Sequence, residues 1–357
     1  MKSLKIVVLA GGLSTERTVS LATGTEVCRA LRSKGHKAIL VDMFLGLESY
    51  SGTLDDIFDV PDGLCGEAVI HASEPDLEQV RAQRKDQSAS RLGKDVLTVC
   101  GMADAVFLAL HGACGEDGRI QATFDLLGIP YTGSGHLGSG MSMDKAITKH
   151  AMERIGIPTA QWCEVYYDAE NIPELAQKLP VPCAVKVING GSSIGVALPD
   201  TREELEKALR DILKYGNHVI VEEKISGREF SVGVLNEHYL PAVEIIPQNG
   251  SYFDYEAKYQ AGGSLEICPA DIPESLWHAM GEAALALHQT MRLSVYSRTD
   301  FIVREDGTFC CLEINTLPGL TSASLLPKEA KAIGLSYPDL CELLIYLSLE
   351  ARKGENL

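Results

Sequence analysis

Residues 298–315 read RTDFIVREDGTFCCLEIN, and this stretch decides how the later part of the chain folds. Two short apolar runs flank the pair Asp306-Gly307. An Asp-Gly pair in this setting is the strongest short signal for a β-hairpin with a two-residue turn, so we predict two antiparallel strands. The residues at the open end of this hairpin are polar: Arg298, Asp300, Glu313 and Asn315.

Counting outward from the predicted turn gives the pairing of the two strands. Asp300 then faces Glu313, and Arg298 faces Asn315. Because side chains alternate between the faces of a strand, these four groups share one face. Two carboxylates about 5 Å apart repel each other, which demands a cation or a raised pKa. Oxygen ligands of the Asp, Glu and Asn type suit Mg²⁺, and an arginine beside them suits an anion held on the metal.

This metal-site hypothesis depends on the length of the turn. A turn of two residues also places Val303 opposite Cys310, and a longer loop would break the whole pairing. The alternative is a solvated hairpin end, with Arg298 in an ordinary surface ion pair.

The composition is typical of a globular protein with more than one domain. A chain of 357 residues is too long to fold around one ordinary hydrophobic core, so two or three domains are expected. The net charge of −17 gives no support for binding to nucleic acid or to an anionic membrane. The ten cysteines form no C-x-x-C pair, which predicts reduced core thiols. Without a signal peptide or an apolar run near ~18 residues, we expect a cytoplasmic protein.

The first 41 residues predict a strand, a helix and a second strand. LKIVVLA at 4–10 is apolar and is followed by two glycines. A helical pattern with one apolar face runs on to Gly35, and KAILV at 37–41 resumes a strand. This order favours a parallel α/β domain. Three more strands are predicted, at 104–110, 182–187 and 219–223, the last two of an antiparallel type.

Changes in these patterns divide the chain into three regions. The first, residues 1–135, is the parallel α/β domain. The second, residues 136–224, begins with a helix that Asp144 can cap and that stops at Gly156. The third, residues 225–357, contains the hairpin.

Two glycine-rich stretches are candidates for a nucleotide site. INGGSSIG at 188–195 can present N–H groups and hydroxyls to phosphate, although it is no Walker A loop and a plain hairpin loop is the alternative. Lys186, next to it, would add a cation. GSGHLG at 133–138 fits the dinucleotide pattern, but its strand is very short and it lacks an acidic ribose ligand. We interpret it instead as a tight crossing between regions.

Two further features carry groups for a substrate. Glu16 lies near the N-terminus of the first predicted helix, either as a capping charge or as a carboxylate for a substrate ammonium group. YFDYEAKYQAGGS at 252–264 is aromatic, charged and glycine-ended. Such a stretch is either a lid over a site or a packed surface loop.

Together these motifs resemble the D-alanine–D-alanine ligases of the ATP-grasp superfamily. The resemblance runs along almost the whole chain in the same order, with 44–100 as the poorly matched stretch. It rests on GGLSTERTVSL, HGACGEDGRIQATFDLLGIPYTGSG, SMDK, GGSSIG, YFDYEAKY, RTDF and LEINTLPGLTSASL.

The resemblance implies a fold and its cofactors. The fold is α/β, with α+β character in the later regions, and its three-domain ATP-grasp architecture grips ATP between the second and third domains. Two Mg²⁺ ions, for which Mn²⁺ can substitute, would be held by Asp300, Glu313 and Asn315. The residues implied for ATP binding are Lys145, Lys186, Ser192, Ser193, Glu222, Glu223, Ile225, Glu229 and Lys258.

The same resemblance implies a site for a first D-alanine. Glu16 would bind its ammonium group, with His111 near its carboxylate. Ser192 and Tyr259 would link to Glu16 by hydrogen bonds and close the site.

A second D-alanine would bind beside the first. Ser324 and Leu325 would hold its carboxylate, while Arg298 and the backbone N–H of Gly319 would stabilise the tetrahedral intermediate. The implied product is D-alanyl-D-alanine for peptidoglycan precursors, made through an acyl phosphate. The resemblance also implies a homodimer, with no nucleic acid or membrane as partner.

Some alternatives stay open at this point. D-serine could replace the second D-alanine, whereas D-lactate is disfavoured because Tyr259 resembles the members that use amino acids. A non-catalytic nucleotide-binding regulator is disfavoured by the retained charged residues, and a dinucleotide oxidoreductase would leave the hairpin carboxylates without a role. The chain also departs from the family in KVINGGSSIG, where Val187 replaces a proline and Gly190 replaces a side chain.

Overall fold

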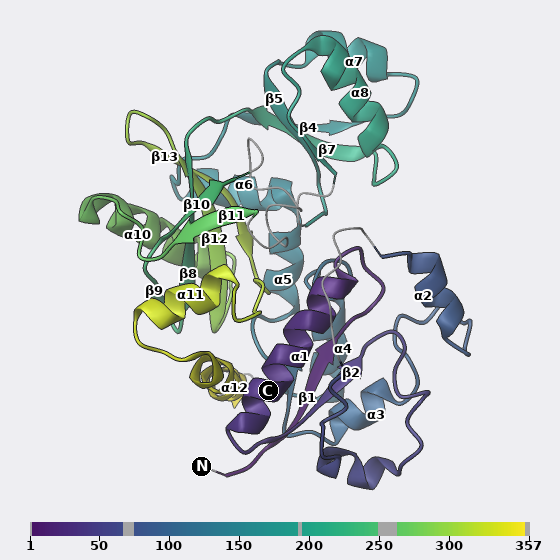
Figure 1. The fold of residues 1–357 in the computed structure, drawn as a ribbon. Helices are drawn as coiled ribbons and strands as arrows, with labels where there is room; N and C mark the ends of the chain where they lie inside the picture. Colours follow the sequence, from purple (N-terminus) through teal and green to yellow (C-terminus); the bar gives the residue numbers. More distant parts are fainter. Residues whose placement is uncertain (1, 67–74, 192–194, 249–262, 354–357) are drawn as a thin grey trace.

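The protein is described by a computed structural model that covers residues 2–66, 75–191, 195–248 and 263–353. It contains three β-sheets, each with helices against it. Figure 1 shows the first sheet at one end of the molecule and the four-stranded sheet at the other, with the six-stranded sheet beside the space between them. The α/β fold class predicted from the sequence is confirmed.

The first sheet is parallel and three-stranded, in the order β2-β1-β3. Its strands are β1 (Lys5–Ala10), β2 (Lys37–Asp42) and β3 (Ala105–Leu108). The connecting helix α1 (Arg17–Ser33) buries the apolar face that the sequence predicted, so the βαβ prediction is confirmed. The other elements of this part are η1 (Leu54–Asp59), α2 (Leu77–Gln83), α3 (Val96–Gly101) and α4 (Arg119–Leu127).

The last helix of the chain packs against the first sheet's core. Helix α12 (Tyr337–Lys353) lies beside α1 in Figure 1. Its buried residues Leu340, Leu344 and Ile345 belong to the same hydrophobic cluster as the three parallel strands. Helix α12, near the C-terminal end, therefore packs against the elements formed by the first residues of the chain.

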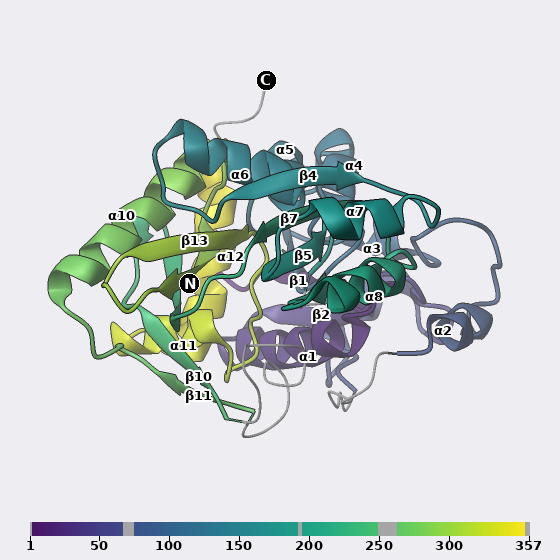
Figure 2. The same ribbon diagram turned by 90° about the horizontal axis from the view of Figure 1, so that it is seen from above.

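The second sheet is antiparallel, in the order β4-β7-β5-β6. Its strands are β4 (Trp162–Tyr166), β5 (Cys183–Val187), β6 (Val196–Ala197) and β7 (His218–Glu223). Helices α7 (Ile172–Lys178) and α8 (Arg202–Ile212) cover its outer face (Figures 1 and 2). Helix α6 (Lys145–Arg154) lies on the inner side and follows α5 (His136–Met143) in the chain. The antiparallel strands predicted at 182–187 and 219–223 are confirmed.

Helix α6 begins where the sequence predicted, but its buried face differs from a simple apolar pattern. The Asp144 side chain accepts a hydrogen bond from the Ile147 N–H at 3.0 Å, so the predicted cap is present. Ile147 itself is exposed, whereas Lys149 and Met152 are buried. A charged residue therefore occupies the inner face of this helix.

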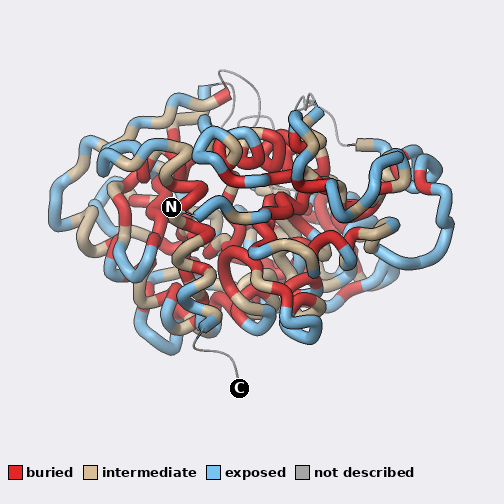
Figure 3. Tube along the Cα trace, turned by 90° about the horizontal axis from the view of Figure 1, so that it is seen from below, coloured by how far each residue is buried: buried red, intermediate tan, exposed pale blue. Residues whose placement is uncertain are grey.

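The third sheet has the order β11-β10-β8-β12-β13, with β9 paired to β8. Its strands are β8 (Arg228–Leu235), β9 (His238–Tyr239), β10 (Val243–Pro247), β11 (Ser264–Ile267), β12 (Tyr296–Val303) and β13 (Phe309–Asn315). Helices α10 (Glu274–Thr290) and α11 (Leu325–Ala332) pack against it. The tube in Figure 3 shows buried segments running through the middle of the molecule, enclosed by exposed ones.

The hairpin β12–β13 confirms the important pairs and corrects the turn. Asp300 pairs with Glu313 and Arg298 with Asn315, as predicted. The predicted pairing of Val303 with Cys310 is wrong, because Val303 pairs with Phe309. A bulge after Asp300 restores the register.

The turn itself is longer than two residues. The Arg304 N–H donates to the Thr308 carbonyl at 2.8 Å, which leaves residues 305–307 as a three-residue loop. Gly307 ends this loop with φ of +84°, the left-handed conformation that three-residue hairpin loops need at that position.

The stretch GSGHLG forms a tight crossing, as we interpreted it. A Cβ on Gly138 in α5 would lie 2.9 Å from the carbonyl oxygen of Arg292. Helix α5 therefore approaches the chain that leads into β12 too closely for any side chain there.

All ten cysteines are free, as predicted, and six of them are buried. Within the described ranges no single helix is long and apolar enough to cross a membrane; only α11 and α12 taken together, across a 100° bend, pass on length and composition.

We expect the close contact of α1 with the first sheet to tolerate no added bulk. A Cβ on Gly24 would lie 2.6 Å from the Ala10 Cβ and 2.7 Å from the Leu40 Cδ1. Gly24→Val should lower the free energy of unfolding by about 1–3 kcal/mol, measured by urea denaturation, because overpacking forces the backbone to shift. Gly101→Val is the control, since nothing lies within 4 Å of its added Cβ. Equal midpoints for the two variants would contradict this packing.

Candidate active site

The polar end of the hairpin is a connected group of side chains. Arg298 donates two hydrogen bonds to Asp300, Nε to Oδ1 and Nη2 to Oδ2, both at 2.8 Å. The Asn315 amide nitrogen donates to Asp300 Oδ2 at 3.1 Å. Since Asp300 is buried, these contacts offset the cost of removing its charge from water. The predicted face of four polar groups is therefore present.

A second buried charge lies across the cleft, on the inner face of the second sheet. The Glu222 carboxylate of β7 forms ion pairs with Lys186 of β5 and with Lys149 of α6. Burial alone would raise the pKa of Glu222, but the two ammonium groups outweigh it and lower the pKa to about 2. Glu222 is therefore ionised at neutral pH.

A cleft of about 570 Å³ separates the second and third sheets. This volume lies within the range of small-molecule sites. The predicted ATP and metal residues that line it are Lys145, Lys186, Glu222, Glu223, Ile225, Glu229, Asp300 and Glu313. Residues far apart in sequence are thus brought together around one cavity.

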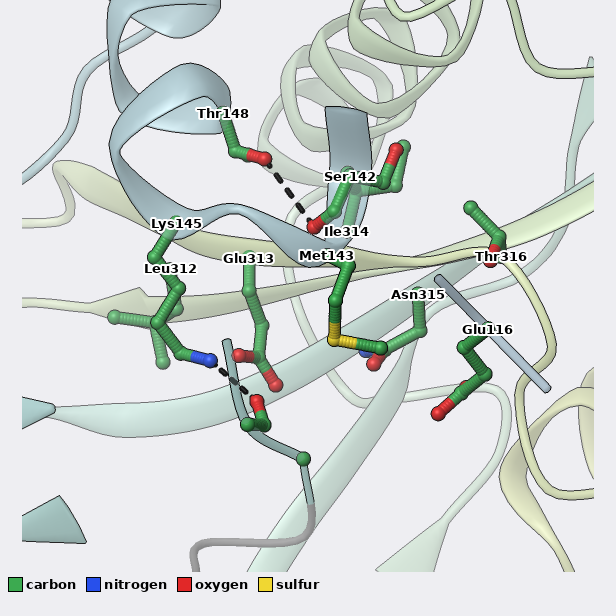
Figure 4. A pocket seen from close by; sticks show the side chains of 12 residues that line it. Glu116, Ser142, Met143, Lys145, Thr148, Leu312, Glu313, Ile314, Asn315 and Thr316 are labelled. Carbon is green, nitrogen blue, oxygen red and sulfur yellow. Dashed lines mark hydrogen bonds between the residues drawn. The ribbon is translucent and has the colours of Figure 1, made fainter. Parts of the chain in front are cut away.

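The glycine-rich stretch is anchored to the start of α6. The Lys145 ammonium group donates to the Gly190 carbonyl oxygen at 2.5 Å, and the Lys145 N–H donates to the Ile188 carbonyl. Figure 4 shows Lys145, Glu313, Asn315 and Glu116 around a small pocket of about 40 Å³ next to the main cleft. The backbone carbonyl of Gly190 therefore already has a hydrogen-bond donor.

A buried carboxylate, that of Glu16, lies against Gly191, one of the residues that line the small pocket. Glu16 precedes α1 and is buried. An added Cβ on Gly112 would lie 2.8 Å from Glu16 Oε2, and one on Gly191 would lie 3.0 Å from it. The carboxylate therefore fits between the loop after β3 and the glycine-rich stretch because neither position has a side chain.

His111 lies in the same region and is neutral at physiological pH. Its Nε2 is 3.5 Å from the Thr23 hydroxyl, and its carbonyl accepts a hydrogen bond from Ser14 Oγ at 2.9 Å. Burial and the Arg298 guanidinium lower the pKa of His111 to about 4. A neutral imidazole has one N–H donor, and the ring also has a hydrogen bond with the backbone of Leu317.

Glu116 is a further buried carboxylate near Glu16. It accepts a hydrogen bond from the Gly112 N–H at 2.7 Å. Burial and the Glu16 carboxylate raise the pKa of Glu116 well above its usual value. The site therefore has at least one carboxyl group that binds a proton readily.

The segment after β13 ends at the N-terminus of α11. Ser324 is the N-cap, and its Oγ accepts a hydrogen bond from the Thr321 N–H at 3.1 Å. A Cβ on Gly319 would lie 3.1 Å from the same oxygen. Leu325 is buried against Val243 and Ile245, so only its backbone N–H is suited to a polar ligand.

Four predicted site residues lie outside the described residues: Ser192, Ser193, Lys258 and Tyr259. Two further charged residues near the cavities, Glu116 and Lys149, were not singled out from the sequence. Glu116 stands inside the quoted stretch HGACGEDG, and Lys149 follows Lys145 by four positions. Helical spacing places Lys149 on the face of Lys145, so that signal was available.

The oxygen donors at the hairpin fit a hard divalent cation. Within the part of the chain that the structure describes, no three His, Cys, Asp or Glu side chains form a cluster for a metal. Asp300 and Glu313 supply two carboxylates and Asn315 an amide oxygen. Mg²⁺ uses one or two carboxylates and completes its shell with water and phosphate, so this small set is sufficient for it.

The sequence matches two family descriptions in chain order. "D-ala D-ala ligase N-terminus" matches residues 5–134, and "D-ala D-ala ligase C-terminus" matches residues 151–346. The D-alanine–D-alanine ligase of Pediococcus pentosaceus is 42% identical over 96% of this chain and 97% of its own length. That of Lacticaseibacillus casei is 41% identical over 94% of this chain and 93% of its own.

A solved structure gives the same result in three dimensions. The crystal structure of D-alanine–D-alanine ligase from Bacillus anthracis complexed with ATP has a TM-score of 0.72 and 29% identity to this chain. The match covers 99% of this chain and 100% of that one. The chain belongs to the D-alanine–D-alanine ligase family.

Proposed function

We propose that this protein is an ATP-dependent ligase that joins two D-alanines into D-alanyl-D-alanine, a building block of peptidoglycan precursors. The observation that carries the proposal is that Lys186, Asp300 and Glu313 line one cleft, while Gly191, which lines both cavities, lies against the buried Glu16 carboxylate. Such a site combines a carboxylate for an ammonium group with cations for phosphates. The family membership supports the same reaction.

ATP binds in the cleft between the second and third sheets in this proposal. Glu222, Glu223, Ile225 and Glu229 line the end suited to adenine and ribose. Lys145 and Lys186, with Ser192, Ser193 and Lys258, meet the phosphates. The proposal includes three domains, with boundaries at about residues 135 and 224, and ATP binds between the second and the third.

Two Mg²⁺ ions, or Mn²⁺ in their place, would be held by Asp300, Glu313 and Asn315. When bound, they offset the charge of the phosphates and of the transferring phosphoryl group. Arg298 is held on Asp300 by two hydrogen bonds, so its guanidinium is oriented before substrate arrives. That orientation suits it to stabilise the oxyanion that forms on the substrate carbonyl.

The two amino acids bind on the side of the first sheet. Glu16 pairs with the ammonium of the first D-alanine, with neutral His111 near its carboxylate, while Ser192 and Tyr259 close the site. Ser324 and the N–H of Leu325 hold the second D-alanine's carboxylate, because a helix N-terminus favours an anion. Gly319 donates its N–H to the oxyanion alongside Arg298.

The reaction has two steps. The carboxylate of the first D-alanine attacks the γ-phosphate of ATP and gives an acyl phosphate and ADP. The amine of the second D-alanine then attacks the acyl carbonyl, and phosphate leaves. ATP is needed because a free carboxylate is a poor electrophile, and exclusion of water protects the acyl phosphate from hydrolysis.

The proposal extends to assembly and location. We propose a homodimer, since Leu126 and Leu127 of α4 and Leu137 of α5 are exposed at 89%, 54% and 46%. The His136–Asp125 contact at 2.7 Å joins the two helices near these leucines, and we take the three leucines together as the proposed interface patch. Dependence on ATP suits a cytoplasmic enzyme.

The direct test of function measures phosphate release with ATP, Mg²⁺ and single D-amino acids, with products identified by mass. We expect release to require D-alanine and to yield the dipeptide. A mixed product with D-serine would identify the alternative ligase. ATP binding without turnover of any D-amino acid pair would identify a non-catalytic regulator and reject the proposal.

Glu313→Gln should reduce turnover by about two orders of magnitude or more, while the thermal midpoint changes little. The substitution keeps the shape of the side chain and removes a charge proposed to bind metal. Turnover is measured across a Mg²⁺ titration, with Glu305→Gln, exposed in the turn of the same hairpin, as the control. Near-normal activity in the first variant would refute the metal assignment.

Leu126→Glu should convert the dimer into a monomer, because a charge at the centre of an apolar interface loses its hydration. Light scattering after size-exclusion chromatography measures the mass. Ile333→Glu, at another exposed site directly after α11, should leave the dimer intact. The patch is not the interface if both variants behave alike.

A further inference from the structure

Lys149 is a buried lysine for which the reaction described above has no use. It is 1% exposed, and its ammonium group lies 2.5 Å from Glu222 Oε2. It also donates a hydrogen bond to Thr159 Oγ1 at 2.6 Å, and that hydroxyl donates to the Cys311 carbonyl at 2.9 Å. Lysine is almost never fully buried without a specific partner, so these contacts fix the side chain.

The position of Lys149 is set by the helix that also carries Lys145. The two lysines are four residues apart, so they project from one face of α6 toward the second sheet. Lys145 lines the ATP cleft, whereas Lys149 does not and lies behind Glu222. Glu222 is therefore the cleft-lining residue with which Lys149 forms an ion pair.

Glu222 is shared between the two sides of the cleft wall. Its Oε1 pairs with Lys186, which lines the cleft, and its Oε2 pairs with Lys149, which does not. Two ammonium groups and one carboxylate leave one net positive charge. Without Lys149, Glu222 and Lys186 would form a neutral pair, and the cleft wall would lose its net charge toward a polyanion.

We propose that Lys149 is a positioning residue for ATP: it holds one oxygen of Glu222 so that Lys186 keeps a positive charge for the phosphates. The proposal rests on the proposed ATP site. In this proposal Lys149 touches neither nucleotide nor D-alanine and acts through Glu222.

Lys149→Met tests this directly, because methionine keeps the length and apolar packing of the lysine stem and removes its charge. The dissociation constant of ATP with Mg²⁺, measured by calorimetry without D-alanine, should rise about tenfold, equivalent to one net charge contact. The KM for ATP should rise similarly, while the KM for D-alanine stays within about twofold. Lys207→Met, on the exposed face of α8, is the matched control and should change neither constant.

A second variant separates charge from structure. Lys149→Arg keeps the positive charge and the N–H donors that hold Glu222 Oε2. Its ATP affinity should stay within about threefold of the unmodified protein, and it should fold even where Lys149→Met does not, since Glu222 keeps two cations.

The outcomes are distinct. ATP affinity unchanged in Lys149→Met, equal loss of ATP and D-alanine affinity, or an equal loss of ATP affinity in Lys149→Arg would each overturn the positioning role. Binding of ATP by the unmodified protein without dipeptide formation would instead reject the proposed function. The effect of Lys149→Met on ATP binding could still be measured in that case.

Discussion

The site depends on two buried carboxylates, Asp300 and Glu222, that are matched with cations before a ligand arrives. Asp300 is held by Arg298 and Asn315, and Glu222 is held by two lysines. A buried charge that is left unpaired costs several kcal/mol, so these pairs set the positions of the groups around them. The cations that a phosphate needs are therefore fixed in place by the fold rather than gathered by the ligand.

The hairpin shows how far local sequence can predict such a site. The pairs Asp300–Glu313 and Arg298–Asn315 were right although the turn was wrong. The loop is one residue longer than an Asp-Gly turn, which shifts the pairing by one, and the bulge after Asp300 shifts it back. Turn length follows local φ/ψ preferences, whereas a bulge depends on neighbouring strands, so only the first has a short-range signal.

Other parts of the site required contacts between distant segments. Helical spacing could have shown that Lys149 shares a face with Lys145, but nothing local shows that this face meets Glu222, more than seventy positions later. The packing of α12 on the first sheet is equally long-range. Strand and helix types, by contrast, followed from periodicity, because burial of one face is a local pattern.

The junction of the three sheets explains why glycine is required on both sides of Glu16. Gly112 comes from the loop after β3 and Gly191 from the stretch after β5, and each would press a side chain onto the Glu16 carboxylate. A side chain at Gly191 would push the second sheet away from the first, and one at Gly112 would displace the Glu16 carboxylate itself. Either change would lengthen the distance between the proposed D-alanine site and the proposed phosphate-binding lysines, and in-line attack on a phosphoryl group depends on that distance. The spacing of the two proposed substrate sites thus depends on two residues that have no side chain.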